Sequence, residues 1–205
     1  MGCDKLVFVS LESSVSTMQF CSTKFEDAWL LKIEPHNDKR GFFARTWCSD
    51  ELRQQGLCDR LVQCSVSFNQ HKGTLRGMHF QAKPCEEVKI VRCTRGAIFD
   101  VLVDCRVNSP TFGQWEGFVL DEENRDALYI PAGFAHGFQT QTECTEVLYQ
   151  MNEYHQPDFA RGFHHLDSRI GIQWPGNITM VSAKDSELVT FDSCMVSSKT
   201  EHQET

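Results

Sequence analysis

The chain has 205 residues, 40% of them hydrophobic and 23% charged, which is enough for one globular domain with a buried core. Its formal net charge of -8 argues against a protein that binds nucleic acid, which needs a net basic face, although a small phosphorylated ligand needs only a few local cations. The sequence holds no apolar run of the roughly 18 residues that span a membrane, so we expect a cytoplasmic protein without a membrane segment.

Ten cysteines are many for a chain of this length. No two of them form a CxxC pair, so the spacing of a zinc ribbon is absent. Most fall in apolar runs such as VRCTRGAIFDVLVDCRV, where a thiol behaves as a small hydrophobic group. We therefore expect reduced, buried thiols, as in a cytoplasmic protein.

The organisation of the chain predicts a single domain. Residues 1–17 are serine-rich and unpatterned, which indicates a flexible N-terminal extension. Residues 18–185 form the expected domain, and residues 186–205, which end in the polar stretch SSKTEHQET, form an expected C-terminal tail. No repeat, low-complexity linker or charge block divides the body.

Short apolar runs follow one another between turn signals along this body. Their ranges are 28–35, 41–47, 61–68, 75–81, 87–94, 97–107, 113–120, 127–133, 137–142 and 145–152. Many short strands at this spacing predict an all-β fold, a jelly-roll sandwich or barrel with a few short peripheral helices. The stretch SDELRQQG, residues 49–56, predicts a helix with Ser49 or Asp50 as its cap. No glycine-rich phosphate loop follows any run, which argues against a doubly wound α/β fold.

The segment GTLRGMHFQ, residues 73–81, combines residue types that are common in ligand sites. His79 can be a metal ligand, a general base or a side chain that fills a wall. In a regular strand Arg76 and His79 would face opposite sides, because an odd number of steps separates them. For both to contact one ligand, the strand must bend near Gly77, or Arg76 must reach the ligand from the barrel rim or from a neighbouring subunit.

A metal site is one interpretation of His79. Metal-binding barrels of the cupin type usually present two histidines as H-x-H on one strand, with a carboxylate and a later histidine. Here His79 stands without a second histidine two residues on, while Glu86, Glu87 and His136 follow as a partial set. A metal-dependent enzyme is therefore an open alternative.

A metal-free acid–base site is the other interpretation. Imidazole titrates near ~6.5, so His79 can act as a base at neutral pH with little tuning. Asp167 is a candidate partner that would fix the tautomer of His79. Lys89, if it points inward from its apolar run, would stabilise an oxyanion. Tyr149 would donate a proton, although core packing is the more common role for such a tyrosine.

Glycines also mark candidate ligand contacts. The run YIPAGFAHGFQT places His136 between Gly133 and Gly137, where we expect a tight turn at the barrel mouth. In such a turn the imidazole contacts either a ligand or the carbonyls of the turn. Arg40 and Arg76 each neighbour a glycine, so each can approach a diphosphate in bidentate fashion.

Several segments, taken in order, resemble the dTDP-4-dehydrorhamnose 3,5-epimerase family. They are RGFFARTW, GTLRGMHFQ, VKIVRCTRGAIFDVLVDCRVNSPTFGQWEGFVL, LYIPAGFAHGFQT, EVLYQMNEYH and DSRIGIQWP, and the resemblance extends over residues 20–175. It implies a cupin-type jelly roll, a homodimer, no metal or other cofactor, and a nucleotide-linked (dTDP-like) 4-keto-6-deoxyhexose as the substrate.

The resemblance also implies roles for individual residues. His79 matches the catalytic base and Asp167 its partner. Tyr149 matches the acid on the opposite face of the sugar, and Lys89 the cation beside the enolate oxygen. The positions that match substrate contacts are Arg40, Phe43, Arg76, His136 and, less cleanly aligned, Gln63.

The sequence departs from the family pattern in a few places. Arg45 stands where a glutamate is usual, and His155 replaces one tyrosine of a usual pair. Ser168 follows Asp167 where proline is common. These differences bear on the substrate contacts and leave the matched catalytic positions in place.

The sequence thus supports an epimerase that inverts C3 and C5, or C3 alone, in deoxysugar biosynthesis of the dTDP-L-rhamnose type. The alternatives are a metal-dependent cupin enzyme and a non-catalytic sugar-nucleotide-binding protein on the same scaffold. Neither the number of inverted centres nor the nucleotide follows from the sequence.

Overall fold

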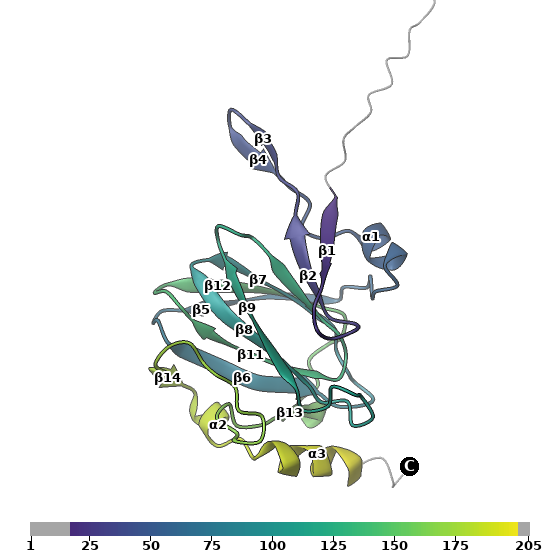
Figure 1. The fold of residues 1–205 in the computed structure, drawn as a ribbon, viewed down its shortest axis with the longest axis vertical. Coiled ribbons are helices and arrows are strands. Elements are labelled where there is room, and N and C mark those ends of the chain that lie inside the picture. Colours follow the sequence, from purple (N-terminus) through teal and green to yellow (C-terminus); the bar gives the residue numbers. More distant parts are fainter. Residues whose placement is uncertain (1–16, 201–205) are drawn as a thin grey trace, which may run out of the picture.

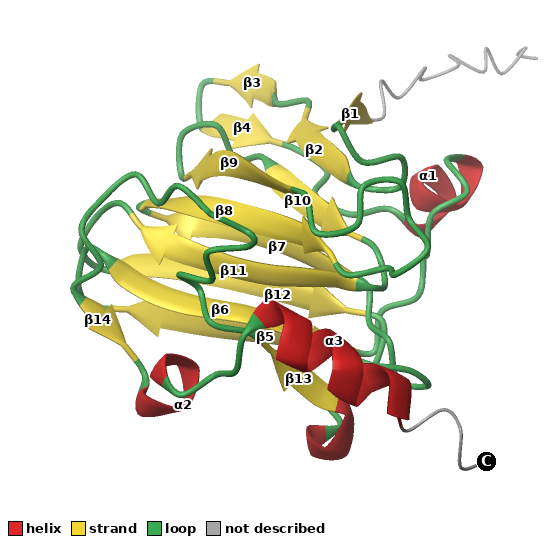
Figure 2. Cartoon of the chain, turned by 60° about the horizontal axis from the view of Figure 1, so that its bottom comes forward, coloured by secondary structure: helices red, strands yellow, loops and turns green. Residues whose placement is uncertain are grey.

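The computed structural model describes residues 17–200, which form two layers of β-sheet (Figure 1, Figure 2). The first layer, which we call the β5 sheet, has the strand order β1 (Met18–Ser22), β2 (Trp29–Ile33), β10 (Ala127–Ile130), β7 (Lys89–Arg95), β12 (Thr145–Met151) and β5 (Gln63–Asn69). The second, the β6 sheet, has the order β13 (Ala160–Gly162), β6 (Thr74–Gln81), β11 (Phe134–Thr140), β8 (Ala97–Asp104) and β9 (Trp115–Asp121), with β14 (Met180–Val181) also paired to β6.

Apolar side chains from both layers fill the space between them. Val91 and Val147 of the β5 sheet pack with Leu102 and Phe138 of the β6 sheet, and all four are fully buried. Burial of each such side chain stabilises the fold by about 1.5–3 kcal/mol. Neighbouring residues of a strand point to opposite faces, so Val101, which precedes Leu102 on β8, faces away from the β5 sheet. It belongs to a second core on the outer face of the β6 sheet.

Short helices cover the outer faces of the sheets. In α1 (Ser49–Gln54), Leu52 is buried against the β5 sheet. The helix α3 (Phe191–Thr200) lies across the β6 sheet and buries Phe191 there (Figure 2). Beside β6 and β13 lie α2 (Ala183–Ser186) and the 3₁₀ helix η1 (Pro157–Phe159). Within residues 17–200, no helix combines the length and the apolar character needed to cross a bilayer.

A two-stranded hairpin stands apart from both layers. Its strands are β3 (His36–Asp38) and β4 (Gly41–Phe43), and Figure 1 shows it projecting away from the sandwich. Phe43 at its end is 75% exposed. Such exposure of a phenylalanine on a projecting element leaves its ring without cover from the rest of this chain.

The all-β prediction is confirmed, and most predicted runs contain a strand. In 41–47 only the first three residues are extended as β4. The predicted helix is present as α1, but its N-cap is Cys48, and no side chain caps it. Neither Ser49 nor Asp50 can do so, because both are already inside the helix.

The prediction that His136 lies in a turn is wrong. The chain turns before Phe134, at Gly133 with φ +82°, and His136 lies inside β11. Gly137 is needed for a different reason, since a Cβ there would lie 2.7 Å from the Arg76 carbonyl oxygen of the neighbouring strand. The glycine therefore allows two strands to approach closely instead of turning the chain.

The expected tail 186–205 is corrected in part. Residues 191–200 form α3, whose Phe191, Cys194 and Met195 are buried against the β6 sheet. These apolar side chains give the segment a face to bury, which explains why it packs. The expected extension 1–17 falls on residues outside the described range except for residue 17, and residues 201–205 are outside it as well.

One edge of β6 is covered by segments from the C-terminal part of the chain. β14 pairs with Thr74 and Leu75, and β13 pairs with His79 through Gln81. Between these two short pairings the amide of Gly77 points to the carboxylate of Asp185 at 3.4 Å. A side chain of α2 therefore takes the place of a strand at the middle of this edge.

Candidate active site

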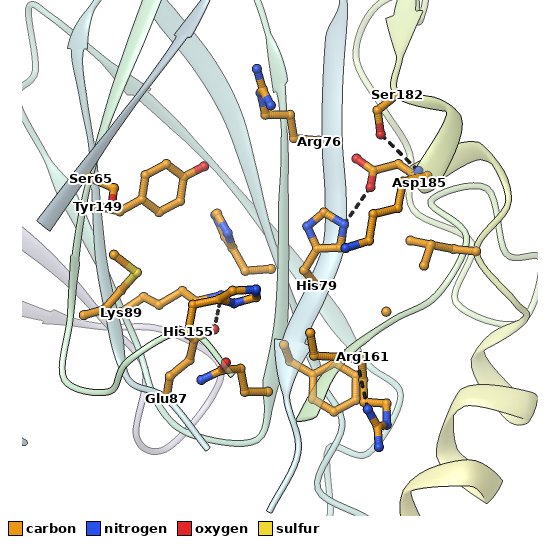
Figure 3. A pocket seen from close by; sticks show the side chains of 18 of the residues that line it. Ser65, Arg76, His79, Glu87, Lys89, Tyr149, His155, Arg161, Ser182 and Asp185 are labelled. Atoms are coloured by element: carbon orange, nitrogen blue, oxygen red, sulfur yellow. Dashed lines mark hydrogen bonds and ion pairs between the residues drawn. The ribbon is translucent and has the colours of Figure 1, made fainter. Parts of the chain in front are cut away.

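A cavity of about 440 Å³ opens between the two sheets (Figure 3). This is within the usual range for small-molecule sites. Its polar and charged lining residues are Gln63, Ser65, Arg76, His79, Gln81, Glu87, Lys89, His136, Tyr149, His155, Arg161, Ser182, Lys184 and Asp185. The structure thus brings together most of the sequence-predicted site residues, whereas Arg40, Phe43 and Asp167 lie outside this cavity.

β6 contains one extra residue at Gly77. His136 of β11 pairs with His79, and Phe138 pairs with Arg76, so three steps along β6 match two along β11. This β-bulge turns Arg76 and His79 to the same side of the sheet. Gly77 has φ +121°, and a Cβ there would lie 2.5 Å from the β11 backbone, so only glycine fits. β6 therefore bends near Gly77, as the sequence requires if Arg76 and His79 are to contact one ligand.

His79 is bonded to Asp185. Its Nε2 lies 2.8 Å from Asp185 Oδ1, while its side chain is 42% exposed to the cavity and that of Asp185 only 7% exposed. A carboxylate at Nε2 holds the proton on that nitrogen and leaves Nδ1 as the basic one. The pair has the arrangement of a general base and its orienting carboxylate.

Asp185 is held in place by its own helix and by the β6 edge. Burial acts to raise the pKa of Asp185, but hydrogen bonds from His79, the Gly77 amide and Ser182 outweigh it and hold the pKa below its ordinary value. The Ser182 hydroxyl accepts a hydrogen bond from the Asp185 amide at 3.0 Å and so caps α2. The carboxylate is therefore ionised at neutral pH and fixed in direction.

The predicted pairing of Asp167 with His79 is wrong. One oxygen of Asp167 accepts the amide of Arg169 at 2.9 Å, and the other accepts the amide of Phe191 at 2.9 Å. These bonds fix a loop and the start of α3, outside the cavity. Asp167 is an anchor for the C-terminal helix, and Asp185 occupies the position beside His79.

Tyr149 faces His79 from the other sheet. It lies on β12 opposite Val91 of β7 and Ser65 of β5, and Figure 3 shows its ring on the far side of the cavity from His79. Burial and the nearby charge of Asp100 raise the pKa of Tyr149. The phenol is therefore protonated at neutral pH and can donate its proton from this wall.

Lys89 points inward at the start of β7. Its parity is that of Val91, which faces the core, and its Nζ lies 2.7 Å from Glu87 Oε1. Met151 pairs with Lys89 on the neighbouring strand, two residues from Tyr149. The ammonium thus lies on the same wall as the tyrosine, where a developing negative charge on a bound ligand would meet it.

His136 forms a second histidine–aspartate pair. Its Nε2 is hydrogen-bonded to Oδ1 of Asp100 on β8. The His136 side chain is 5% exposed and that of Asp100 is fully buried. The His136 ring meets the Tyr149 ring edge-on, with 6.0 Å between centroids. His136 therefore supports the tyrosine and presents only a small part of its surface to the cavity.

Arg40 and Phe43 do not reach the cavity of their own chain. Both belong to the projecting hairpin, where Arg40 forms an ion pair with Asp38 across the turn. The unusual Arg45 also lies away from the cavity and pairs with Glu51 of α1. These residues therefore contribute nothing to the site within one chain.

Several cavity residues were not found from the sequence. Asp185, Lys184 and Ser182 come from the stretch SAKD, which fits the serine-to-acid spacing of a capping box. That signal predicts the start of a helix and does not connect it with His79. Glu87 was considered only as a metal ligand, and Arg161 of β13 carries no local signal.

Metal ligands do not gather in the part of the chain that the structure describes. No group of three or more histidine, cysteine, aspartate or glutamate side chains is placed to hold an ion there. Glu86 lines a separate cavity next to Gly133, so the partial set expected from the sequence is divided. The imidazoles of His79 and His136 each bond to a separate carboxylate.

The arrangement has a clear chemical capacity. His79, whose imidazole can accept a proton, and Tyr149, whose phenol can donate one, face each other across the cavity, and Lys89 lies on the wall that carries the tyrosine. Removal of a proton on one face of a carbon and its return on the other inverts that centre. Fold and site together therefore define an acid–base isomerase built on a jelly roll.

Comparisons with known proteins agree with this class. The family model for dTDP-4-dehydrorhamnose 3,5-epimerase matches residues 22–193. A dTDP-4-dehydrorhamnose 3,5-epimerase of Sinorhizobium fredii is 40% identical over 175 residues, covering 85% of this chain and 90% of the relative. A dTDP-4-dehydrorhamnose 3-epimerase of Streptomyces niveus is 36% identical over 163 residues, covering 79% of this chain and 78% of the relative.

A solved structure shows the same fold. The crystal structure of dTDP-4-dehydrorhamnose 3,5-epimerase from Bacillus anthracis, with TDP and PPi bound, matches with a TM-score of 0.82 at 39% identity. The match covers 85% of this chain and 99% of that chain. The chain belongs to the dTDP-4-dehydrorhamnose 3,5-epimerase family, and it is an isomerase with a cupin-type jelly roll.

Proposed function

We propose that the protein inverts C3 and C5, or C3 alone, of a dTDP-linked 4-keto-6-deoxyhexose in deoxysugar biosynthesis of the dTDP-L-rhamnose type. The observation that carries this proposal is the placement of His79 and Tyr149 on facing sheets. The family membership supplies the substrate class, because the similar proteins are named for this sugar nucleotide.

The reaction needs no more than a placed base, a placed acid and a cation. Asp185 holds His79 so that Nδ1 takes the proton from the carbon next to the C4 ketone. The negative charge moves to O4, where the ammonium of Lys89 stabilises it. Tyr149 returns a proton to the other face of the carbon, which completes the inversion. The ketone acidifies the carbon, and the cavity supplies orientation.

Cations at the cavity suit a diphosphate. Arg76 projects into it from the bulge and is held by Asn69 Oδ1 at 2.7 Å from its Nε. Arg161 and Lys184 approach from β13 and α2. In a protein with a net charge of -8, this local gathering of cations favours an anionic ligand. Gln63 and Ser65 add polar contacts from β5.

We further propose that the protein is a homodimer in which the β3–β4 hairpin of one subunit completes the cavity of the other. Arg40 and Phe43 support this, because they match substrate contacts in sequence yet lie away from the cavity of their own chain. The edge strand β5 also exposes Val66 and Phe68, whose cover by a second copy would remove apolar surface from water.

Complementation between two inactive variants tests the exchanged hairpin. Arg40→Ala and His79→Gln are purified separately, then unfolded and refolded together. In an exchanged dimer, the mixed species contains one cavity with both residues intact, so activity returns. If the hairpin is not exchanged, Arg40 contacts neither cavity, so Arg40→Ala alone would keep the wild-type activity, and this would contradict the exchange. Refolding each variant alone is the control.

Deuterium exchange tests the function itself. The protein is incubated with a dTDP-4-keto-6-deoxyhexose in D2O, and the sugar is followed by NMR. Deuterium at C3 and C5 is the expected result, and deuterium at C3 alone would identify a 3-epimerase like the Streptomyces niveus relative. Binding without exchange at either carbon would contradict the proposal and favour a non-catalytic sugar-nucleotide-binding protein.

Chelation tests the metal-dependent alternative from the sequence. Exchange is measured before and after dialysis against EDTA, with the metal content determined by elemental analysis. Full activity at substoichiometric metal is expected, whereas loss of activity that is restored by one added metal would favour a metal-dependent cupin enzyme.

We also propose a cytoplasmic location, which the free state of all nine cysteines among residues 17–200 supports.

A further inference from the structure

Glu87 is a carboxylate in the cavity that the proposed reaction does not use. Its Oε1 lies 2.7 Å from the Nζ of Lys89, and the two side chains are 10% and 13% exposed. The other carboxylate lining the cavity, Asp185, is bonded to His79. A nearly buried negative charge opposes the binding of an anionic sugar nucleotide, so its presence needs an explanation.

The position of Glu87 explains it. Glu87 lies two residues before Lys89, and the inward direction of Lys89 matches that of Val91 on the same strand. The carboxylate therefore reaches the ammonium along one side of β7, from outside the strand end. Figure 3 shows Glu87 and Lys89 together on the wall that also carries Tyr149. From there Glu87 restrains the ammonium without occupying the space between His79 and Tyr149.

We propose that Glu87 is a positioning residue that aims the ammonium of Lys89 at the developing oxyanion. This rests on the proposed function, since it assumes that Lys89 meets the enolate oxygen. A lysine side chain has four rotatable bonds in its stem, and its free ammonium samples many positions. The contact with Glu87 removes that freedom before the substrate arrives. It uses one N–H of the ammonium and leaves two for the ligand.

The physical gain is preorganisation. A cation that must first move into place stabilises the transition state less than one already there, because its reorganisation opposes catalysis. A pair with little exposure to water is also screened less than a surface pair. Glu87 is thus expected to affect the turnover rate more than the affinity for the ground state.

Glu87→Gln tests the proposal, with Glu86→Gln as the matched control. Glu86 is the preceding residue and lines a different cavity beside Gly133, so its substitution removes the same charge without touching Lys89. For Glu87→Gln, kcat for deuterium incorporation is expected to fall about tenfold with KM changed less than about threefold. For Glu86→Gln, both constants should stay within about twofold of the wild-type values.

A double-mutant cycle shows whether Glu87 acts through Lys89. In a Lys89→Met background, Glu87→Gln is expected to lower kcat no further, because there is no ammonium left to aim. An equal loss in both backgrounds would overturn the proposal. The proposal would also be overturned if Glu87→Gln had the same kcat as a wild-type protein that exchanges deuterium. If the wild-type protein itself shows no exchange, the proposed function has failed and not this inference alone.

Glu87→Asp provides the measurement if Glu87→Gln does not fold. Aspartate keeps the charge, but its side chain is shorter by one methylene group. Its carboxylate therefore holds the ammonium of Lys89 in a shifted position. A fall in kcat of about threefold, with a thermal midpoint close to that of the wild type, is expected. Unchanged kcat in this folded variant contradicts a positioning role, since the direction of the ammonium would then have no effect.

Discussion

Two histidine–aspartate pairs lie at the cavity, and they differ in what surrounds them. His79 and His136 are cross-strand neighbours on β6 and β11, and each ring bonds through Nε2 to an aspartate. The imidazole of His79 is 42% exposed, whereas that of His136 is only 5% exposed. The two pairs have the same chemical groups but different access to a ligand.

Their carboxylates differ as well. The carboxylate of Asp185 is bonded to His79 and to the amide of Gly77, so its charge is well satisfied, and the backbone amide of Asp185 donates to Ser182 in the cap of α2. Asp100 is fully buried, and its Oδ2 has no hydrogen-bond partner among the described residues. The first pair is arranged to exchange a proton with a ligand. The second is a buried pair that supports the wall around Tyr149.

The largest effect is expected for the exposed pair at its base. His79→Gln removes the proton acceptor and should lower the deuterium incorporation rate by about 10³-fold, since general-base catalysis contributes about 10²–10⁴. NMR in D2O measures the rate, and thermal unfolding checks the fold. A folded His79→Gln variant with at least a tenth of the wild-type rate would contradict the assignment of the base.

Asp185→Asn should have the next largest effect. The amide cannot stabilise the imidazolium that forms when the base takes a proton, so a loss of about 10²-fold in kcat is expected. KM should change much less, because Asp185 touches His79 and not the ligand. If kcat/KM fell by the same factor because KM rose while kcat stayed unchanged, Asp185 would only shape the cavity.

The same variant changes the dependence of stability on pH. Because the folded-state pKa of Asp185 is depressed, its ionised form stabilises the fold above the ordinary pKa of about 4, and this stabilisation is lost as pH falls through the folded-state value. The difference in the free energy of unfolding between wild type and Asp185→Asn should therefore shrink below about pH 4. Urea titrations from pH 7 to pH 3 measure it; a constant difference would contradict the linkage.

Asp100→Asn is expected to affect stability more than catalysis. It removes the charge that His136 contacts in a buried position, which should lower the free energy of unfolding by about 1–3 kcal/mol. The rate of deuterium incorporation should fall by less than about tenfold, through Tyr149. A loss of activity as large as that of Asp185→Asn, in a stable protein, would mean that the buried pair also transfers protons.

Asp167→Ala should have the smallest effect on activity. It removes the acceptor for the Phe191 amide at the start of α3, which is expected to cost about 1 kcal/mol in the free energy of unfolding. Activity measured at 20 °C should match that of the wild type, because Asp167 lies outside the cavity. A loss near 10²-fold in the folded variant would restore Asp167 as a partner of the base.

The strands were predictable because the pattern of short apolar runs is local. Their cavity residues, such as Lys89 and Tyr149, were matched through the family resemblance, since alternation alone left the direction of Lys89 open. The shared face of Arg76 and His79 was not predictable, because a bulge depends on the partner strand: β11 fixes the register on either side of Gly77. The sequence could state only that a bend was required. Likewise, Gly137 allows β11 and β6 to pack closely. A sequence alone does not distinguish this role of a glycine from its role in a turn.

Asp185 escaped prediction for a different reason. It lies 106 residues from His79 in sequence, and the two meet only because β13, β14 and α2 return along the edge of β6. Asp167 fitted the same chemical expectation and lies closer to the recognisable motifs. Residue type and order cannot decide between two aspartates when the path of the chain sets their distance. The carboxyl group of Asp167 was recognisable as functional chemistry, but its role is structural.

The late position of Asp185 has a consequence for chains that stop early. A chain that ends after β13 would contain every strand of the two layers except β14, and with them His79, Lys89 and Tyr149. It would lack the carboxylate bonded to His79, which lies in α2. Such a truncated chain would hold the facing side chains of the cavity without the group that orients the imidazole.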